Sequence, residues 1–113
     1  MTDAPTPSEI RLSADKQTLQ IGFESGENFS LSAELLRVES PSAEVQGHGA
    51  GQKVTPKDKE NVKIIGIEPV GNYAVRLAFD DGHNTGIFSW DILVDYGRRQ
   101  DSLMAAYRER LGA

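Results

Sequence analysis

The sequence predicts an α+β fold in which an antiparallel sheet of about six strands is covered on one side by two or three helices. Three observations lead to this prediction. Apolar and polar residues alternate in several short stretches, as they do in half-buried strands. Turn-forming residues separate these stretches closely enough for antiparallel hairpins. Finally, the order strand, strand, turn, strand, helix occurs twice along the chain.

The composition is that of an ordinary globular domain. The 113 residues are 38% hydrophobic and 26% charged, which is enough chain for one domain with its own core. The formal net charge of −5 argues against generic binding to nucleic acid or anionic membranes, because such binding depends on clustered Lys and Arg. The absence of cysteine excludes disulfides, thiolate metal sites and cysteine nucleophiles.

The amino-terminal segment is not expected to be a signal peptide. Residues 1–8 are rich in Pro and Thr and are predicted to form a disordered tail. They lack the basic and apolar regions of a signal peptide. No apolar run reaches the ~20 residues that a membrane helix requires. We therefore expect a cytoplasmic protein.

The first block of the chain is predicted to hold three strands and a short helix. Apolar residues alternate at 9–13 and 18–23, and a third short strand at 29–31 follows a turn. Ser32 is a favourable N-cap for the helix that comes next. Pro41 should end that helix, because proline cannot continue its hydrogen bonds.

The segment from 41 to 61 shows no clear periodicity. A connection of this length without secondary structure is unusual in a compact domain, and it indicates a functional segment, a mobile one, or an element that the pattern does not reveal. Its second half is highly charged and is predicted to be a solvated loop.

The second block repeats the design of the first. The β-branched stretch 62–70 suits a central strand, and 73–79 alternates cleanly. A turn at 80–83 and a short strand follow. Ser89 is then predicted to cap a helix, and Gly97 to end it.

A separate amphipathic helix is predicted at 98–113, capped by Asp101 or Ser102. We expect it to pack on the sheet or on a second subunit. The predicted organisation is therefore a tail at 1–8, a domain at 9–97 and this terminal helix. Its apolar residues at helical spacing are Leu103, Met104, Tyr107 and Leu111.

The two blocks align with each other. The turn Phe23–Gly26 matches Phe79–Gly82 with a shift of 56 residues, and the helix start Ser32–Leu36 matches Ser89–Leu93 with a shift of 57. Two β-β-β-α pseudo-repeats are therefore predicted.

A glycine-rich loop, Gly47-His48-Gly49-Ala50-Gly51, is the most unusual stretch of the sequence. Successive amides of such a loop are able to cradle an anion. However, no Lys-Ser/Thr pair follows, so it is not a Walker A loop, and it lacks the spacing of a dinucleotide fingerprint. A simply flexible loop is the plainer interpretation.

The only two histidines are His48 and His83. With Glu44, Asp80 or Asp81 they would form a two-histidine, carboxylate site for zinc or iron. The alternative is that both histidines are exposed in surface loops, since no recognised ligand spacing connects them.

Two further features each have two interpretations. Asp80-Asp81 resembles a carboxylate pair for acid–base chemistry, but Asp-Asp-Gly between alternating strands is typical of a turn. Trp90 is a candidate anchor for a partner protein. Its position beside a helix cap favours helix–sheet packing instead.

Several of these motifs resemble the gamma-butyrobetaine-hydroxylase-like amino-terminal domain family. The resemblance covers about residues 8–97 and is carried by 35–44, the Gly-His-Gly loop, 67–73, and 79–83 with Trp90. It implies a domain that occurs as small free-standing bacterial proteins of unassigned function. The same domain precedes the catalytic domain of carnitine-pathway dioxygenases and is fused to iron–sulfur-carrier ATPases.

In the dioxygenases, three cysteines and a later histidine of this domain hold a structural zinc. The resemblance places those cysteines at Ser40, Ser42 and Val45, and the histidine at His83. Neutral serine and apolar valine cannot replace thiolates, so the family zinc site is not expected here. The domain with the 2-His-1-carboxylate iron site is also absent from the sequence, which implies no hydroxylase activity.

We therefore expect a non-catalytic accessory or protein-interaction domain with a protein partner. By resemblance, that partner belongs to iron–sulfur or metal handling, for example an iron–sulfur-carrier ATPase, and a homodimer is also open. The alternative is a metal-ion or small-ligand-binding domain that uses His48, His83 and nearby carboxylates. The predicted partner-binding residues are Ser40, Pro41, Ser42, Gln46, Gly47, His48, Gly49, Gln52, Asp81, His83 and Trp90.

Overall fold

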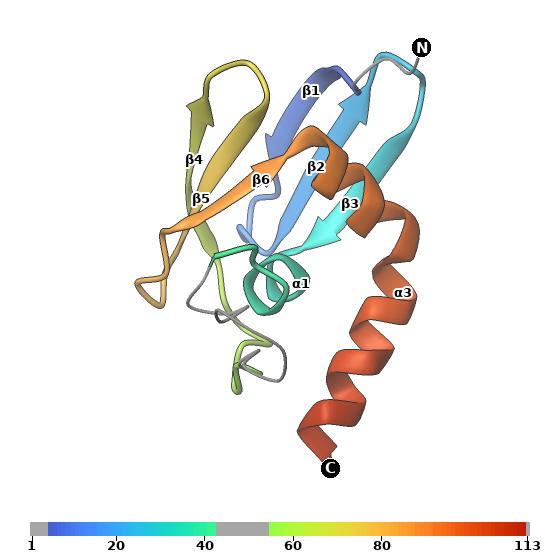
Figure 1. The fold of residues 1–113 in the computed structure, drawn as a ribbon. Coiled ribbons are helices and arrows are strands. Elements are labelled where there is room, and N and C mark those ends of the chain that lie inside the picture. The colour runs from blue at the N-terminus through green and yellow to red at the C-terminus, as the bar shows by residue number, and fades with distance from the viewer. Residues whose placement is uncertain (1–4, 43–54, 113) are drawn as a thin grey trace.

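The computed structural model describes residues 5–42 and 55–112. Figure 1 shows how the strands and helices of these residues are arranged. The elements are β1 (Pro7–Leu12), β2 (Thr18–Phe23), β3 (Asn28–Ser32), α1 (Ala33–Val38), β4 (Ile64–Val70), β5 (Ala74–Phe79), β6 (Gly86–Ser89) and α3 (Trp90–Gly112).

The α+β class is confirmed, but the prediction of a single six-stranded sheet is wrong. The strands form two separate antiparallel sheets, β1-β2-β3 and β4-β5-β6. The free edge of β3 is closed by a side chain of α3. The Gln100 amide accepts a hydrogen bond from Ser32 N at 3.0 Å and donates one to Ser30 O at 2.8 Å. A helix therefore occupies the place that a fourth strand would need, because these edge groups are already satisfied.

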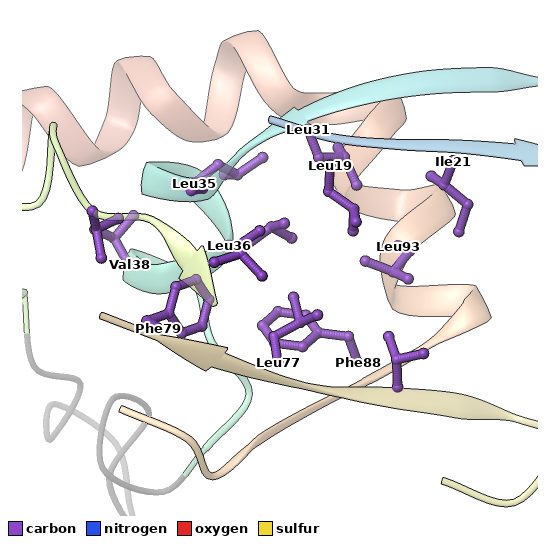
Figure 2. Packing of buried hydrophobic residues seen from close by; sticks show 14 of the residues in the cluster. Leu19, Ile21, Leu31, Leu35, Leu36, Val38, Leu77, Phe79, Phe88 and Leu93 are labelled. Carbon is purple, nitrogen blue, oxygen red and sulfur yellow. The ribbon is translucent and has the colours of Figure 1, made fainter. Parts of the chain in front are cut away.

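The hydrophobic core lies between the two sheets. Figure 2 shows Leu19 and Leu31 of one sheet pointing toward Leu77 and Phe88 of the other, with Leu36 of α1 between them. All five side chains are fully buried. Burial of one such side chain contributes about 1.5–3 kcal/mol, so this shared layer accounts for much of the stability. The alternation seen in the sequence is thus the inward face of each sheet.

The two halves repeat each other in their backbone hydrogen bonds. Phe23 N donates to Glu27 O and Phe79 N donates to His83 O, both at 2.9 Å. The glycine in each of these turns has a positive φ, 97° in the first and 92° in the second, which glycine adopts without strain. The predicted pseudo-repeat is therefore present in the fold.

The helix starts repeat as well. The Ser32 hydroxyl accepts a hydrogen bond from Leu35 N at 3.0 Å, and the Ser89 hydroxyl accepts one from Ile92 N at 3.2 Å. Both predicted N-caps are confirmed. Each satisfies a backbone N–H that has no partner within its own helix.

The two helices end differently. Helix α1 stops at Val38, ahead of Pro41, as predicted. Helix α3 continues through Gly97 to Gly112, so the predicted break and the separate helix at 98–113 are wrong. Gly97 is small for a packing reason. A Cβ there would lie no more than 2.9 Å from three atoms of the Phe29 ring, which packs directly on the helix backbone.

The predicted tail at 1–8 is too long. Strand β1 begins at Pro7, which pairs with Phe23, and Thr6 O accepts a hydrogen bond from Glu24 N at 2.9 Å. The ordered domain therefore begins before residue 9. No helix in the described ranges is both long enough and apolar enough to cross a bilayer.

Candidate functional site

Polar side chains from distant parts of the sequence converge where the chain leaves α1. We call Ser40, Ser42, His83 and Thr85 the polar corner. Ser40 Oγ lies 2.9 Å from His83 Nε2, and Ser42 Oγ lies 2.6 Å from Thr85 Oγ1. Ser40 is 0% exposed and His83 is 4% exposed. Breaking a buried hydrogen bond of this kind costs about 1–3 kcal/mol, so the polar corner fixes the segment after α1 against the β5–β6 connection.

Strand β6 provides the space for this contact. A Cβ at Gly86 would lie 2.5 Å from Ser40 Oγ, so any larger residue would push the hydroxyl away from His83. In the other half of the repeat, the glycine lies on the opposite side of the equivalent contact. Phe29 stands at the strand position equivalent to Gly86, and Gly97 stands at the helix position equivalent to Ser40. One contact therefore joins a glycine on the strand to a serine just after α1, and the other joins a phenylalanine on the strand to a glycine within α3.

Next to the polar corner is an ion cluster made by Arg37, Lys59 and Asp81, which we call the Asp81 cluster. Arg37 Nε and Lys59 Nζ each lie 2.7 Å from the same carboxylate oxygen, Asp81 Oδ2. The other oxygen accepts a hydrogen bond from His83 N at 3.1 Å. Among the residues that the structure describes, none accepts a hydrogen bond from Nη1, a buried guanidinium nitrogen of Arg37.

The Asp81 carboxylate is strongly stabilised in its charged form. Burial by itself would raise its pKa, but hydrogen bonds from Lys59, from His83 N and from Arg37 outweigh that effect and hold the pKa at about 2. The side chains of Arg37 and Asp81 are only 13% and 19% exposed. The charged Asp81 side chain therefore connects α1, the loop before β4 and the β5–β6 connection.

Side chains along α3 reinforce the same region. Glu39, at the end of α1, pairs with Arg110 at 3.0 Å and accepts a hydrogen bond on its carbonyl from Tyr96 OH at 2.6 Å. Burial, with the nearby charge of Glu39, raises the pKa of Tyr96 to about 12, so this phenol remains a donor. Tyr107 OH donates to Pro56 O at 2.6 Å. The helix predicted to be separate thus docks on the site.

Asp80 and Asp81 form a turn, as the plainer interpretation holds. Gly82 N donates to Phe79 O at 3.1 Å, and Asp80 Oδ1 accepts from Lys63 N at 3.0 Å. Each carboxylate bonds a different neighbour. They are therefore arranged to hold the connection in place and do not face each other as an acid–base pair.

Trp90 lies away from the polar corner. Its indole N–H donates to Asn72 O at 2.9 Å, in the β4–β5 turn, and its ring packs against the core. The length of β5 separates that turn from the β5–β6 connection, roughly 17 Å at about 3.3 Å per residue. The structure therefore does not bring Trp90 beside His83, because the two lie at opposite ends of the sheet.

The predicted glycine-loop residues fall outside the described part of the chain, as do Glu44 and Val45. The partner-binding role given to these residues and the pairing of His48 with His83 stay predictions. Pro41 is half-buried at the polar corner. The predicted partner-binding residues that lie outside the described ranges are Gln46, Gly47, His48, Gly49 and Gln52.

The described residues do not fit a zinc ion. Of the two serines that the resemblance equates with cysteine ligands, Ser40 lies beside His83, and Ser42 donates a hydrogen bond from its backbone N–H to Ser40. However, neutral hydroxyls are not zinc ligands of the usual kind, and His83 Nε2 already bonds Ser40. Within residues 5–42 and 55–112, no three His, Asp or Glu side chains gather as a ligand group. Hydrogen bonds therefore hold Ser40, Ser42 and His83 in position.

Sequence reasoning missed Arg37, Lys59 and Thr85. Asp81 is 44 residues from Arg37 and 22 from Lys59, so no local pattern connects them. The pseudo-repeat offered the only signal, since it places the helix end and the β5–β6 turn at equivalent points of the two halves.

Comparison with known proteins places this architecture in a family. The family described as gamma-butyrobetaine hydroxylase-like, N-terminal, matches residues 10–94. Two protein structures solved by NMR in solution are 49% and 44% identical, with TM-scores of 0.82 and 0.83. Each covers 98% of this chain, and the matches span 83% and 87% of those chains respectively.

A third relative is the crystal structure of a protein with unknown function from Acidithiobacillus ferrooxidans, which belongs to the DUF971 family. It is 42% identical, with a TM-score of 0.63, over 78% of this chain and 88% of that one. No curated protein matches the sequence. With a family match over most of its length and a shared fold, the chain belongs to the gamma-butyrobetaine hydroxylase-like N-terminal domain family.

Proposed function

We propose that this domain is a non-catalytic protein-interaction module that presents the β5–β6 connection, residues 80–85, as a rigid recognition element. The observation that carries the proposal is the Asp81 cluster. It anchors the connection from within, while Gly82, Asn84 and Thr85 stay exposed on its outer side. A recognition element that is already ordered loses little entropy on binding, so more of its contact energy appears as affinity.

The polar corner supports an interaction role better than a catalytic one. Ser40 and His83 are buried and bonded to each other, so a substrate would have to separate them before it reached either group. A nucleophile–base pair needs an accessible nucleophile beside a place for the reacting atom. Here the pair holds the recognition element in place.

For the partner we propose an iron–sulfur-carrier ATPase, because the family resemblance links this domain to such proteins. The net charge of −5 further favours a partner with a basic contact surface. This proposal concerns docking alone and assigns no metal to the domain.

Binding of the purified ATPase to two single variants tests the proposal. Asn84→Arg places a bulky cation on the recognition element, and Gln20→Arg makes the same change on the exposed outer face of the first sheet. We expect Asn84→Arg to weaken binding by about tenfold or more, equivalent to about 1.4 kcal/mol, and Gln20→Arg to leave it unchanged. Equal affinity of both variants would remove residues 80–85 as the docking site, and absence of any binding would remove this partner.

A second candidate function is metal-ion binding through His48 and His83. It rests on the resemblance, which equates His83 with the histidine of the family zinc site; the neighbouring Ser40 and Ser42 would not act as ligands. Elemental analysis of the purified protein, with thermal unfolding in zinc and in iron, distinguishes it from the first. A bound metal that is lost in His83→Ala would support this candidate, and a metal-free protein with unchanged unfolding temperature would discard it.

A further inference from the structure

The dipeptide Asp81-Gly82, in the β5–β6 connection, is chemically vulnerable. It is the only place in the sequence where glycine follows aspartate or asparagine. Glycine has no Cβ to shield its amide nitrogen or to restrict its backbone, so this nitrogen is able to reach the side chain of the preceding aspartate. Attack there forms a cyclic imide, which is the first step of aspartate isomerisation.

This isomerisation needs only water as a co-reactant. The Gly82 nitrogen forms a bond to Cγ of the protonated Asp81 carboxyl group, and the C–OH bond of that group breaks. The hydroxyl leaves as water with the proton of the Gly82 amide. Water then opens the imide at the main-chain carbonyl of Asp81, and the chain afterwards runs through the former side chain. The product is isoaspartate, which has the same mass and one more carbon in the main chain.

The fold requires both residues of this dipeptide. Gly82 has a φ of 92°, a conformation that is strained for a residue with a side chain. Asp81 is required for its charge, since its carboxylate holds the two cations of the Asp81 cluster. The turn itself does not need a carboxylate. In the first half of the repeat, Ser25 Oγ accepts the corresponding hydrogen bond, from Glu27 N at 3.4 Å.

We propose that Asp81-Gly82 is a latent isoaspartate site, which the bonds of Arg37 and Lys59 to the carboxylate keep unreacted. Both cations lie 2.7 Å from one oxygen, Oδ2, and the His83 amide donates to the other oxygen at 3.1 Å. The side chains of Arg37 and Asp81 are mostly buried. The carboxyl group has to give up these bonds before Cγ turns toward the glycine nitrogen, so the cluster opposes the attack.

The same bonds keep the carboxyl group in its unreactive form. Only the protonated acid loses water readily, because the charged carboxylate has no good leaving group. Burial raises the pKa of Asp81, but the hydrogen bonds from Lys59, from the neighbouring amide and from Arg37 outweigh it and hold the pKa at about 2, against an ordinary 3.8. At neutral pH the protonated fraction is therefore lower by roughly sixtyfold, which limits the acceleration that loss of these bonds produces through protonation.

The first half of the repeat provides the same turn without these two cations. In both turns the glycine N–H donates to the phenylalanine carbonyl three residues before it, at 2.9 Å in the first and 3.1 Å in the second. The φ of the glycine is 97° and 92° respectively. Arg98 lines the same hollow as Ser25 and donates to both carboxylate oxygens of Glu27. Ser25→Asp therefore places an aspartate before glycine in an equivalent backbone that lacks the Asp81 cluster.

Isoaspartate formation in four chains tests the proposal: wild type, Lys59→Gln, Lys57→Gln and Ser25→Asp. Lys57 is exposed in the same loop as Lys59, so its variant is the matched control. Each chain is kept at neutral pH for several weeks and then digested with trypsin, which releases residues 77–98 and 17–37 as separate peptides. Isoaspartate shifts the chromatographic retention of a peptide at unchanged mass, and an isoaspartate-specific methyltransferase labels it. Urea unfolding establishes that all four chains are folded.

We expect isoaspartate at Asp81 to form several times faster in Lys59→Gln than in wild type, below the limit of roughly sixtyfold, while Lys57→Gln matches wild type. In Ser25→Asp, the peptide 17–37 should isomerise faster than 77–98 in the same sample. This second comparison leaves the Asp81 cluster intact, so it does not depend on how Lys59→Gln affects stability.

The proposal is overturned if Asp81 isomerises at the wild-type rate in Lys59→Gln, or if Lys57→Gln accelerates it equally. It is also overturned if the two peptides of Ser25→Asp isomerise at the same rate. The reaction takes place within one chain and needs no partner, so these outcomes leave the proposed docking at residues 80–85 to be decided by its own binding assay.

Discussion

The Asp81 cluster makes a quantitative prediction about pH and stability. The pKa of Asp81 is about 2 in the folded protein against an ordinary value of 3.8, because Lys59, Arg37 and the His83 amide all bond its carboxylate. A shift of this size corresponds to at most about 2 kcal/mol of unfolding free energy. The connection contacts solvent, which screens the charges, so we expect about 1 kcal/mol.

The direction in which stability changes with pH follows from the lowered pKa of Asp81. The folded state holds the charged carboxylate more tightly than the unfolded state does. The stabilisation is therefore fully present above the unfolded pKa of 3.8, and it is lost as pH falls toward the folded value of about 2. Asp81→Asn mimics the protonated state at every pH.

Urea unfolding of wild type and Asp81→Asn, from neutral pH down to about pH 2, measures this effect. Wild type should be more stable at neutral pH, and the difference should shrink as pH falls below about 4. Asp101→Asn, at an exposed position of α3, is the control and should change stability by less than about 0.5 kcal/mol. The reasoning is refuted if Asp81→Asn matches wild type at neutral pH, or if the difference persists unchanged at the acidic end.

Three further substitutions test the packing and the polar contacts. Gly97→Ala should lower the unfolding free energy by about 1–3 kcal/mol despite the helix propensity of alanine, because its Cβ meets an aromatic ring of β3. Gly112→Ala, where no atom of the described residues lies within 4 Å of the added Cβ, should cost nothing, and equal effects in urea unfolding would contradict the packing account. Ser40→Ala removes the hydrogen bond to His83 and should cost about 1–3 kcal/mol; NMR should show a shifted His83 ring, and an unchanged spectrum would count against the buried contact. Gln100→Ala should speed hydrogen exchange of the β3 edge amide to which it bonds, while exchange in β5 stays the same.

Local features of the fold were predictable from the sequence. The inward residues of β2 and β5, the two N-caps at Ser32 and Ser89, and the repeat itself all follow from signals within a few residues of one another. Side-chain alternation, cap hydrogen bonds and turn conformations are short-range effects. Pro41 ended α1 for the same local reason.

The candidate site was predictable only in part. The resemblance brought Ser40, Ser42 and His83 into one place, and in the structure Ser40 contacts both Ser42 and His83. It did not indicate that they would be buried, nor that Asp81 would be held by Arg37 and Lys59. Surface loops are judged polar from sequence, and whether a polar group faces inward depends on the elements that pack over it.

Tertiary structure alone decided the number of sheets and the length of α3. Gln100 closes the edge of β3 from 68 residues away, so the sheet stops at three strands. Gly97 resembles a helix terminator in the sequence, yet it is small because Phe29 packs on it. The sequence by itself determined where strands turn and helices begin, since those depend on neighbouring residues. Which faces and edges meet depends on contacts between distant residues, and these exist only once the chain has folded.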